Sequence, residues 1–517
     1  MMQTWNIKKP AVASDKGIVA AQHFEAAEAG ARVLAAGGNA MDAAVTAAFV
    51  LSIVEPWLSG IGGGGFLLWS DADGGPVEAL DFNVRSSRNM APEQYPLIGG
   101  NDGDWFDWPA VKDDRNIIGY SSICVPGSVA GLAEALEKHG TLGLAEALQP
   151  AIEIAERGML VDWFTSLCLA IDQRGLSMFP ETARLFLDED GHALKAKNGA
   201  ETYLPMPAKA KLLKRLAKAG ARDFYEGEIA AGLVRDLNAG GSVIDAADLA
   251  DYRPEWIAAR AHDYRGHEVN VASGLGGGPS LLDTLKRLET TLPVSAIPGA
   301  PAAKAYARAI RATYADRLTH MGHAGEGQDC TSHLSVVDAA GNMVSLTNTL
   351  LSRFGSKVVL PESGMLMNNG MMWFDPRPGV PNRIAPDVKP LANMAPVIVR
   401  KAGRPWMAIG AAGGRQIFPA LAQILSYVID GGMDLSAAFH TPRIDASAPT
   451  IAVDRAADAD VAAAIAEDFS VNLVTNTLHP VNFSIPSAVM AGEDGHVGMV
   501  HPVNPWAKAV AEDDLDG

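Results

Sequence analysis

The chain is poor in cysteine, in positive charge and in long apolar runs. Its three cysteines, Cys124, Cys168 and Cys330, are too widely spaced for a disulfide framework or a zinc site. The 517 residues include 42 lysines and arginines against 60 aspartates and glutamates, a formal net charge of −18. We expect no nucleic-acid partner, because phosphate binding requires a basic surface. We expect no membrane partner either, because no stretch approaches the roughly 20 uninterrupted apolar residues of a membrane helix.

The N-terminal segment also lacks a feature, namely the apolar core of a secretory signal. Residues 1–17 contain lysines but no such core, so a cytoplasmic location is expected. What the chain does have is 48% hydrophobic and 20% charged residues, the balance of a globular protein with a substantial core. Its length exceeds the usual single-domain size, which predicts two domains or one large layered domain.

The first part of the chain predicts two helices. Apolar residues at helical spacing begin at His23 and stop at Gly37 and Gly38, which suit a helix C-terminus. Asn39 then precedes a segment so rich in alanine and valine that it should be buried on most sides and end near Pro56. Further on, residues 127–318 are expected to alternate amphipathic helices with short loops.

Strands are expected on both sides of this helical region. A strand follows the glycines of residues 60–65, and a second follows the turn DADGG. Two hairpins are predicted later, one turning at DAAGN and one within APVIVRKAGRPWMAIG, and the second leads through GAAGG into a helix. Because hairpins rather than parallel crossovers join these strands, the sheets should be mainly antiparallel, with helices packed outside.

The glycine cluster GIGGGG does not predict a nucleotide cofactor. A dinucleotide fingerprint needs its glycines after a strand and before a helix. Here the order is reversed, since the glycines follow a helix and precede a strand. We therefore interpret them as positions of close backbone approach.

The start of the first hairpin, TSHLSVVDAAGNMVSLTNTL, carries the main catalytic signal. Thr331 follows a polar segment, residues 323–329, that could be cut to leave it as an N-terminus. A terminal α-amine has a pKa of about 7.7–8.0 and is partly neutral near pH 7. An N-terminal threonine therefore supplies nucleophile and base in one residue. Taken alone, Thr331, Ser332 and His333 more often simply begin a strand.

Two further features favour catalysis. Thr349 lies on the returning strand of the same hairpin, where cross-strand pairing could bring its hydroxyl near Thr331. Gly413 and Gly414 stand between a strand and a helix, where backbone N–H groups at the helix N-terminus suit an oxyanion hole. The GAAGG segment alone is more typical of a plain loop.

These features occur together with landmarks spread over nearly the whole chain. The sequence resembles the γ-glutamyltranspeptidase family of N-terminal nucleophile hydrolases in GGNAMDAAVTAAFVLSIVEP, GIGGGGFLLW, VPGSVAGL, DFYEGEIA, DYRGHEV, YADR, TSHLSVVDAAGN, MNNGM and GAAGG. The resemblance implies an α+β fold, a four-layer αββα sandwich with mainly antiparallel sheets. Residues 1–330 and 331–517 would be the large and small subunits of one cleaved precursor.

The resemblance also implies the chemistry. The precursor would cut itself at the Cys330–Thr331 bond, and Thr331 would then attack an amide and form an acyl-enzyme. Thr349 matches the family's second threonine, and Gly413 and Gly414 match the glycines that hold the oxyanion. No metal and no organic cofactor is implied. Cleavage one bond earlier would instead make Cys330 the nucleophile, although the family pattern falls on Thr331.

The substrate-recognition positions depart from the family pattern. Asn83 replaces an arginine that binds the substrate carboxylate, and Arg85 or Arg353 is a substitute for it. Trp373 replaces the acidic residue that binds the substrate amine. Other differences occur at Leu351, Gly370, Ala392 and Asn393.

These departures bear on the substrate. A free amino-acid head group needs a partner for each of its charges, or its burial is costly. We therefore predict an amide hydrolase or acyltransferase whose substrate is not a standard γ-glutamyl compound. An oxamate-type acyl group or a dicarboxylic monoamide fits better, as in the similar oxamate amidohydrolases and cephalosporin acylases, with glutathione as an alternative.

The expected partners are a small-molecule amide and the other half of the cleaved chain, with a homo-oligomer of that heterodimer as an option. A binding protein on the same fold that never matures is a rival prediction. The missing recognition residues favour it, whereas the retention of Thr331, Thr349 and both glycines opposes it.

Overall fold

The α+β architecture is that of a computed structural model, which describes residues 7–101, 108–197, 200–323, 332–477, 482–492 and 494–515. Thirteen of the described strands are hydrogen-bonded side by side in one continuous order. They are β1 (Val12–Ser14), β19 (Gly495–Val500), β18 (Ile485–Gly492), β14 (Arg404–Ala412), β13 (Val397–Lys401), β10 (His267–Ala272), β9 (Glu255–Tyr264), β4 (Glu78–Asp81), β3 (Gly64–Ser70), β12 (Met343–Thr349), β11 (Ser332–Val337), β2 (Ile18–Ala21) and β20 (Lys508–Ala511).

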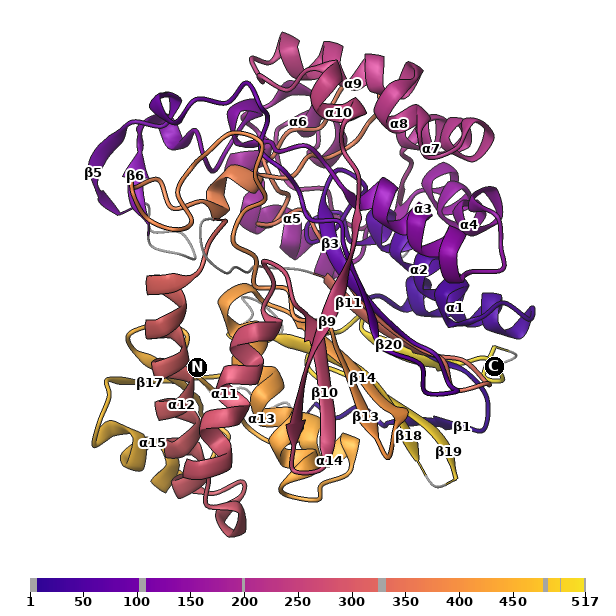
Figure 1. The fold of residues 1–517 in the computed structure, drawn as a ribbon. Coiled ribbons are helices and arrows are strands. Elements are labelled where there is room, and N and C mark those ends of the chain that lie inside the picture. The colour runs from indigo at the N-terminus through magenta and orange to yellow at the C-terminus, as the bar shows by residue number, and fades with distance from the viewer. Residues whose placement is uncertain are drawn as a thin grey trace.

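Every neighbouring pair in this order is antiparallel. The long strand β9 divides it into two halves. Residues 255–258 of β9 pair with β4, and residues 259–264 pair with β10. Figure 1 shows β9 running from one half into the other. The halves then stack, because β11 packs against β14 and β18.

Helices cover both outer faces of the stacked sheets (Figure 1). One face packs against α1 (Phe24–Ala35), α2 (Ala40–Val54), α3 (Ser128–His139) and α4 (Leu144–Arg157). The other packs against α11 (Gly278–Thr291), α12 (Ala300–His320), α13 (Ile417–Ile429) and α14 (Leu435–His440). A third apolar cluster lies between the two sheets. The predicted αββα sandwich with antiparallel sheets is confirmed.

The remaining elements lie around this sandwich. Helices α5 (Trp163–Leu176), α6 (Pro180–Phe186), α7 (Pro207–Ala219), α8 (Asp223–Glu226), α9 (Glu228–Ala239) and α10 (Ala246–Ala250) extend the layer of α1 to α4. Small sheets form from β5 (Leu97–Asn101) and β6 (Pro109–Val111), from β7 (Met159–Leu160) and β8 (Tyr203–Leu204), and from β15 (Ile444–Asp445), β16 (Ile451–Asp454) and β17 (Val471–Val474), the last beside α15 (Ala459–Ala466).

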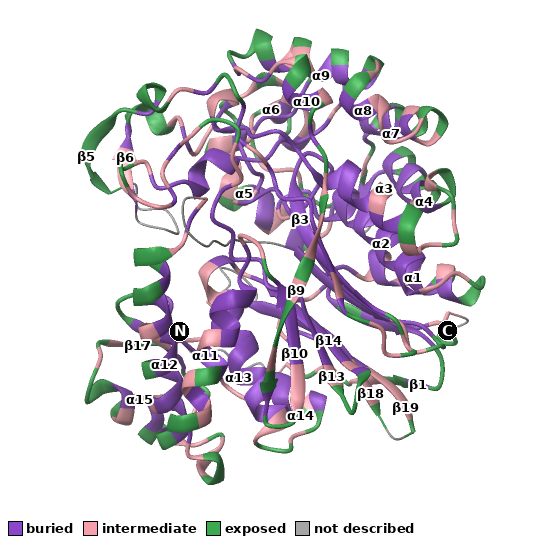
Figure 2. Cartoon of the chain, viewed as in Figure 1, coloured by how far each residue is buried: buried purple, intermediate pink, exposed green. Residues whose placement is uncertain are grey.

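Helix α2 shows how the sequence produces this core. Asn39 caps its start by accepting from the backbone N–H groups of Met41 and Asp42, and the Asp42 carboxylate accepts from Asn39 N at 2.8 Å. All its residues are buried, as their composition predicts, and it ends at Val54, just before Pro56. Figure 2 shows the buried elements concentrated in the strands and in α2.

One prediction about the fold was wrong. Residues 127–318 are not only helices and loops, because they contain the hairpin of β9 and β10. Strand β9 lacks a regular buried and exposed alternation, since it leaves one half-sheet and enters the other. Because of this irregularity, β9 does not show the alternation of apolar and polar residues by which a strand is recognised in a sequence. Among the described helices, none has the length and apolar character to cross a membrane.

Candidate active site

The hairpin of β11 and β12 builds one wall of the candidate site. Its described ladder begins where Ser332 pairs with Asn348, the residue before Thr349. Thr331 and Cys330 lie outside the described residues. Side chains alternate along the two strands. The His333 ring meets the opposite sheet, where a Cβ added to Gly410 would lie 2.4 Å from its Cε1 atom, whereas Ser332 reaches Glu55 beside α2.

His333 has a structural role in this arrangement. Its ring is buried, with Nδ1 at 3.0 Å from Thr347 Oγ1 and Nε2 at 2.9 Å from Ser335 Oγ. Burial lowers the pKa of His333 to about 3, so the ring is neutral at physiological pH. Both nitrogens are hydrogen-bonded within the sheets. Because both partners belong to the hairpin of β11 and β12, the histidine that follows the hydroxyl pair stabilises this hairpin, packs against Gly410 of the opposite sheet and is not placed as a base.

Thr349 ends β12 and is fully buried. Its Oγ1 accepts a hydrogen bond of 2.8 Å from Leu351 N, which leaves the hydroxyl proton free to be donated. Leu351 has a φ of +88°, a left-handed conformation that costs a side-chain-bearing residue about 1–3 kcal/mol. The turn after Thr349 is therefore strained and must be held by its surroundings.

The glycines of residues 60–65 allow β3 to approach this turn. A Cβ added to Gly63 would lie 1.8 Å from Thr349 O, and one added to Gly65 would lie 2.1 Å from Thr347 O. Only glycine fits at such distances. The interpretation of this cluster as a site of close backbone approach is confirmed.

Gly413 and Gly414 lie where β14 ends and α13 is about to begin. Their φ angles are +128° and +61°, so both occupy backbone conformations that favour glycine. Ser484 closes over Gly413, since a Cβ there would lie 2.8 Å from Ser484 Cα, and Ser484 Oγ donates to Ala412 O at 2.7 Å. The two glycines thus form a turn directly before a helix, and their role as an oxyanion hole stays a prediction.

The two arginines that could replace the family's carboxylate-binding residue are both engaged. Arg85 Nε lies 3.3 Å from Asp387 Oδ1, and the guanidinium stands 5.8 Å from the Tyr252 ring centroid. Arg353 Nη2 lies 2.9 Å from Asp172 Oδ2. A substrate carboxylate would have to compete with these acids.

Asn83 is also held by its own neighbourhood. The side chain is buried, its Oδ1 accepts from Val84 N at 2.8 Å, and its Nδ2 lies 3.4 Å from Pro390 O. Tyr252 donates to the carbonyl of Asn83 at 2.7 Å. These contacts favour a structural role for Asn83, although its assignment to substrate binding stays untested.

Trp373 and Asn393 differ from these residues because each has a buried donor without a partner. Trp373 Nε1 and Asn393 Nδ2 donate to no acceptor among the described residues, and both residues are at most 1% exposed. Arg317 donates to Asn393 Oδ1 at 2.8 Å, which fixes the orientation of the amide. A buried N–H without a partner costs about 1–3 kcal/mol, so both positions would gain from an acceptor on a ligand.

A cavity of about 270 Å³ lies beside the loop that contains Trp373. Met371, two residues before Trp373, lines it together with Met90, Tyr95, Tyr120 and Ile123. Polar side chains, among them Gln94 and Arg115, also line it, so the mixed lining suits a small organic group with polar substituents.

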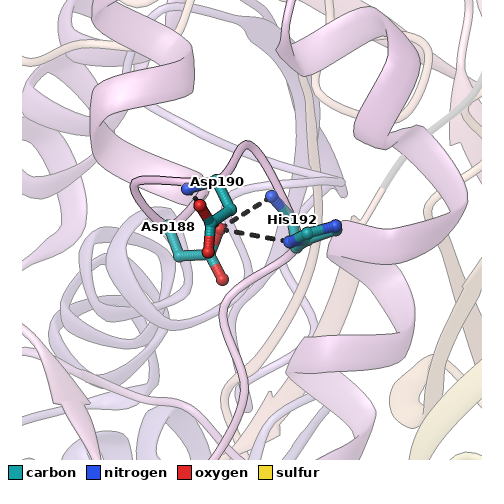
Figure 3. A group of neighbouring side chains, drawn as sticks. All are labelled: Asp188, Asp190 and His192. Carbon is teal, nitrogen blue, oxygen red and sulfur yellow. Dashed lines mark hydrogen bonds and ion pairs between the residues drawn. The ribbon is translucent and has the colours of Figure 1, made fainter.

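One group of side chains among the described residues could hold a metal ion by proximity. Figure 3 shows these residues, Asp188, Asp190 and His192, on an exposed turn. Asp188 Oδ1 already accepts from the backbone N–H groups of Asp190 at 3.1 Å and of His192 at 2.8 Å. The carboxylate therefore shapes the turn, and we assign no metal to it.

Comparisons with known proteins agree with this geometry. The family model described as Gamma-glutamyltranspeptidase matches residues 26–328 and 318–510. An "Acylase ACY 1 proenzyme" from a Pseudomonas species is 35% identical over 497 residues, covering 89% of this chain and 87% of that proenzyme. A "Glutathione hydrolase proenzyme" from Escherichia coli is 29% identical over 486 residues, covering 84% and 81%.

A solved structure supports the same fold. The crystal structure of cephalosporin acylase from Bacillus halodurans superimposes with a TM-score of 0.86 at 22% identity, covering 99% of this chain and 98% of that one. The fold and the family match define an amide-hydrolysing enzyme of the N-terminal nucleophile class. The chain belongs to the γ-glutamyltranspeptidase family, which confirms the resemblance seen in the sequence.

Proposed function

We propose that the chain cuts itself between Cys330 and Thr331 and that Thr331 becomes the nucleophile. The observation that carries this proposal is the pairing of Ser332 with Asn348, which brings the start of β11 beside the buried hydroxyl of Thr349. Cleavage would give fragments of residues 1–330 and 331–517. The names of the two related proenzymes support maturation of this kind.

In the mature enzyme the α-amine of Thr331 takes the proton of its own hydroxyl. The oxygen attacks the amide carbon, and the N–H groups of Gly413 and Gly414 stabilise the oxyanion. The amine leaving group departs with a proton, and an ester on Thr331 remains. Water or a second amine then attacks this ester, releases the acyl group and restores the hydroxyl.

The substrate that fits best has an acyl group without an α-amine. Trp373 offers a neutral N–H where an ammonium group would need a carboxylate, and Asn393 offers a second neutral donor. Two such donors suit the oxygens of an oxamate-type or dicarboxylic monoamide. The cavity beside Met371 provides room for a longer acyl or leaving group. The relative named an acylase supports this choice, and the one named a glutathione hydrolase supports glutathione as the alternative.

Intact mass spectrometry of freshly purified wild-type protein beside Thr331→Ala and Cys330→Ser tests the nucleophile. Wild type and Cys330→Ser should give two fragments, and Thr331→Ala should stay whole. Two normal fragments from Thr331→Ala, or a cut one residue earlier in wild type, would contradict the proposal. A wild-type chain that stays whole would favour the rival prediction of a binding protein.

A panel of oxamate, glutaryl-p-nitroanilide and glutathione tests the substrate. We expect a higher kcat/KM for one of the first two than for glutathione, and the reverse order would restore the γ-glutamyl assignment. The cytoplasmic location and any assembly of two cleaved pairs stay predictions.

A further inference from the structure

The strained loop after Thr349 is held in place by ion pairs to one acid, which lies on a helix far away in the sequence. Asp172, on α5, places Oδ2 at 2.9 Å from Arg353 Nη2 and Oδ1 at 2.9 Å from Lys357 Nζ. The Asp172 and Lys357 side chains are only 12% and 11% exposed, so solvent screens this contact weakly. Lys357 Nζ also donates to Arg353 O, which ties the two ends of the turn together.

The loop needs such restraint because its backbone is unusual. Leu351, Phe354 and Lys357 have φ angles of +88°, +57° and +65°, in the left-handed region that side-chain-bearing residues avoid. A segment with three such residues persists only when its neighbours hold it in place. Phe354 N donates to Trp57 O at 2.9 Å, and Thr182 Oγ1 donates to Lys357 O at 2.8 Å. Asp172 adds its two ion pairs to these hydrogen bonds.

The same loop fixes the hydroxyl of Thr349. Leu351 N donates to Thr349 Oγ1 at 2.8 Å, and the next residue is fixed by Asn369, whose Oδ1 accepts from Ser352 N at 3.0 Å. If the loop relaxes, the N–H of Leu351 turns away and the hydroxyl of Thr349 loses the bond that orients it. The path from Asp172 to Thr349 therefore runs through one short, strained segment.

We propose that Asp172 is a positioning residue for catalysis, which acts through the loop of residues 351–357 on the hydroxyl of Thr349. This inference rests on the proposed function, in which Thr349 supports the Thr331 nucleophile. Asp172 belongs to the 1–330 fragment and the loop to the 331–517 fragment. The ion pairs of Asp172 with Arg353 and Lys357 thus make the catalytic geometry depend on contact between the two fragments.

The test follows self-cleavage in a cell-free translation, timed from synthesis. Asp172→Asn keeps the size of the side chain and removes its charge. We expect it to slow cleavage about tenfold, since a catalytic group displaced by a fraction of an ångström loses rate on that scale. In the mature enzyme, kcat for glutaryl-p-nitroanilide at saturating substrate should fall, because the hydroxyl of Thr349 is misplaced, whereas KM reports separately whether Arg353, released from Asp172, contacts the substrate carboxylate. The control Glu156→Gln removes the acid of an exposed pair with Lys214, and should cleave like wild type.

A double-mutant comparison separates positioning from general stability. If Asp172 acts through Thr349, then Asp172→Asn/Thr349→Ala should cleave as slowly as Thr349→Ala alone. Multiplied effects, or a normal rate in Asp172→Asn, would overturn the inference. If circular dichroism shows that Asp172→Asn does not fold, Lys357→Gln is used instead, because it removes one of the two ion pairs of Asp172. Lys357→Gln combined with Thr349→Ala must then cleave as slowly as Thr349→Ala alone. A wild-type chain that stays uncut would overturn the proposed function and this inference with it, whereas a normal Asp172→Asn rate overturns only the inference.

Discussion

At the scale of single residues, an unusual ionisable group is Glu55, which contacts Ser332, the residue that follows the candidate nucleophile in the sequence. It follows α2 directly, is 1% exposed, and its Oε2 accepts from Ser332 Oγ at 3.3 Å. Burial raises the pKa of Glu55 to about 8, although the bond from Ser332 opposes the shift. The carboxyl is therefore mainly protonated at pH 7 in the folded chain. In the unfolded chain it ionises near pH 4.5.

This difference predicts a pH dependence of folding stability. Between pH 4.5 and 8 the folded chain binds the proton that the unfolded chain has released, so the free energy of unfolding falls as pH rises, by up to about 1.4 kcal/mol per pH unit. Glu55→Gln should flatten this decline and be more stable than wild type at pH 9. Urea unfolding at pH 5, 7 and 9, both chains carrying Thr331→Ala so that neither is cut, checks it. Parallel curves for the two chains would show that Glu55 does not titrate in this range.

At the scale of secondary-structure elements, the tightest backbone contact of the site lies where the chain entering β3 meets the end of β12. A methyl group at residue 63 would overlap the carbonyl of Thr349, and neither backbone can move without disturbing the ladder of Thr349 with Gly64. Gly63→Ala should therefore destabilise the fold by about 1–3 kcal/mol or more. It should also slow self-cleavage more than its stability loss explains.

The matched control is Gly75→Ala, in the turn before β4, where the nearest atom to the added Cβ is Asp71 Cβ at 4.0 Å. It should change stability by less than about 0.5 kcal/mol. Urea midpoints and cleavage rates of both variants, measured together, check the comparison. Equal midpoints for the two variants would mean that the strands can separate at little cost.

Sequence periodicity predicted those helices and strands that have the same surroundings along their whole length. Helix α2 and the hairpin of β11 and β12 were predictable, because burial, capping and turn residues all act within short segments. Strand β9 was missed because its two ends belong to different sheets. Asp172 and Glu55 carried no local signal, since their roles come from contacts with residues far along the chain.

At the scale of the whole molecule, the proposed cleavage point separates two fragments that share one core. Strands β11 and β12 of the second fragment lie between β2 and β3 of the first, and β13 pairs with β10. At the ends of the order, β19 pairs with β1 and β20 pairs with β2. Each fragment thus exposes strand edges and apolar faces when it is alone.

The fragments should consequently stay together after cleavage and unfold together. In size-exclusion chromatography of the cleaved wild type, residues 1–330 and 331–517 should elute in one peak, and urea should dissociate them only at the concentration that removes secondary structure. Residues 331–517 produced alone should be insoluble or unfolded, because β11, β12, β13 and β19 would each lack a neighbouring strand. A folded, soluble 331–517 fragment would show that the second half has a core of its own, and the contact between Asp172 and the loop of residues 351–357 would then join two independent units.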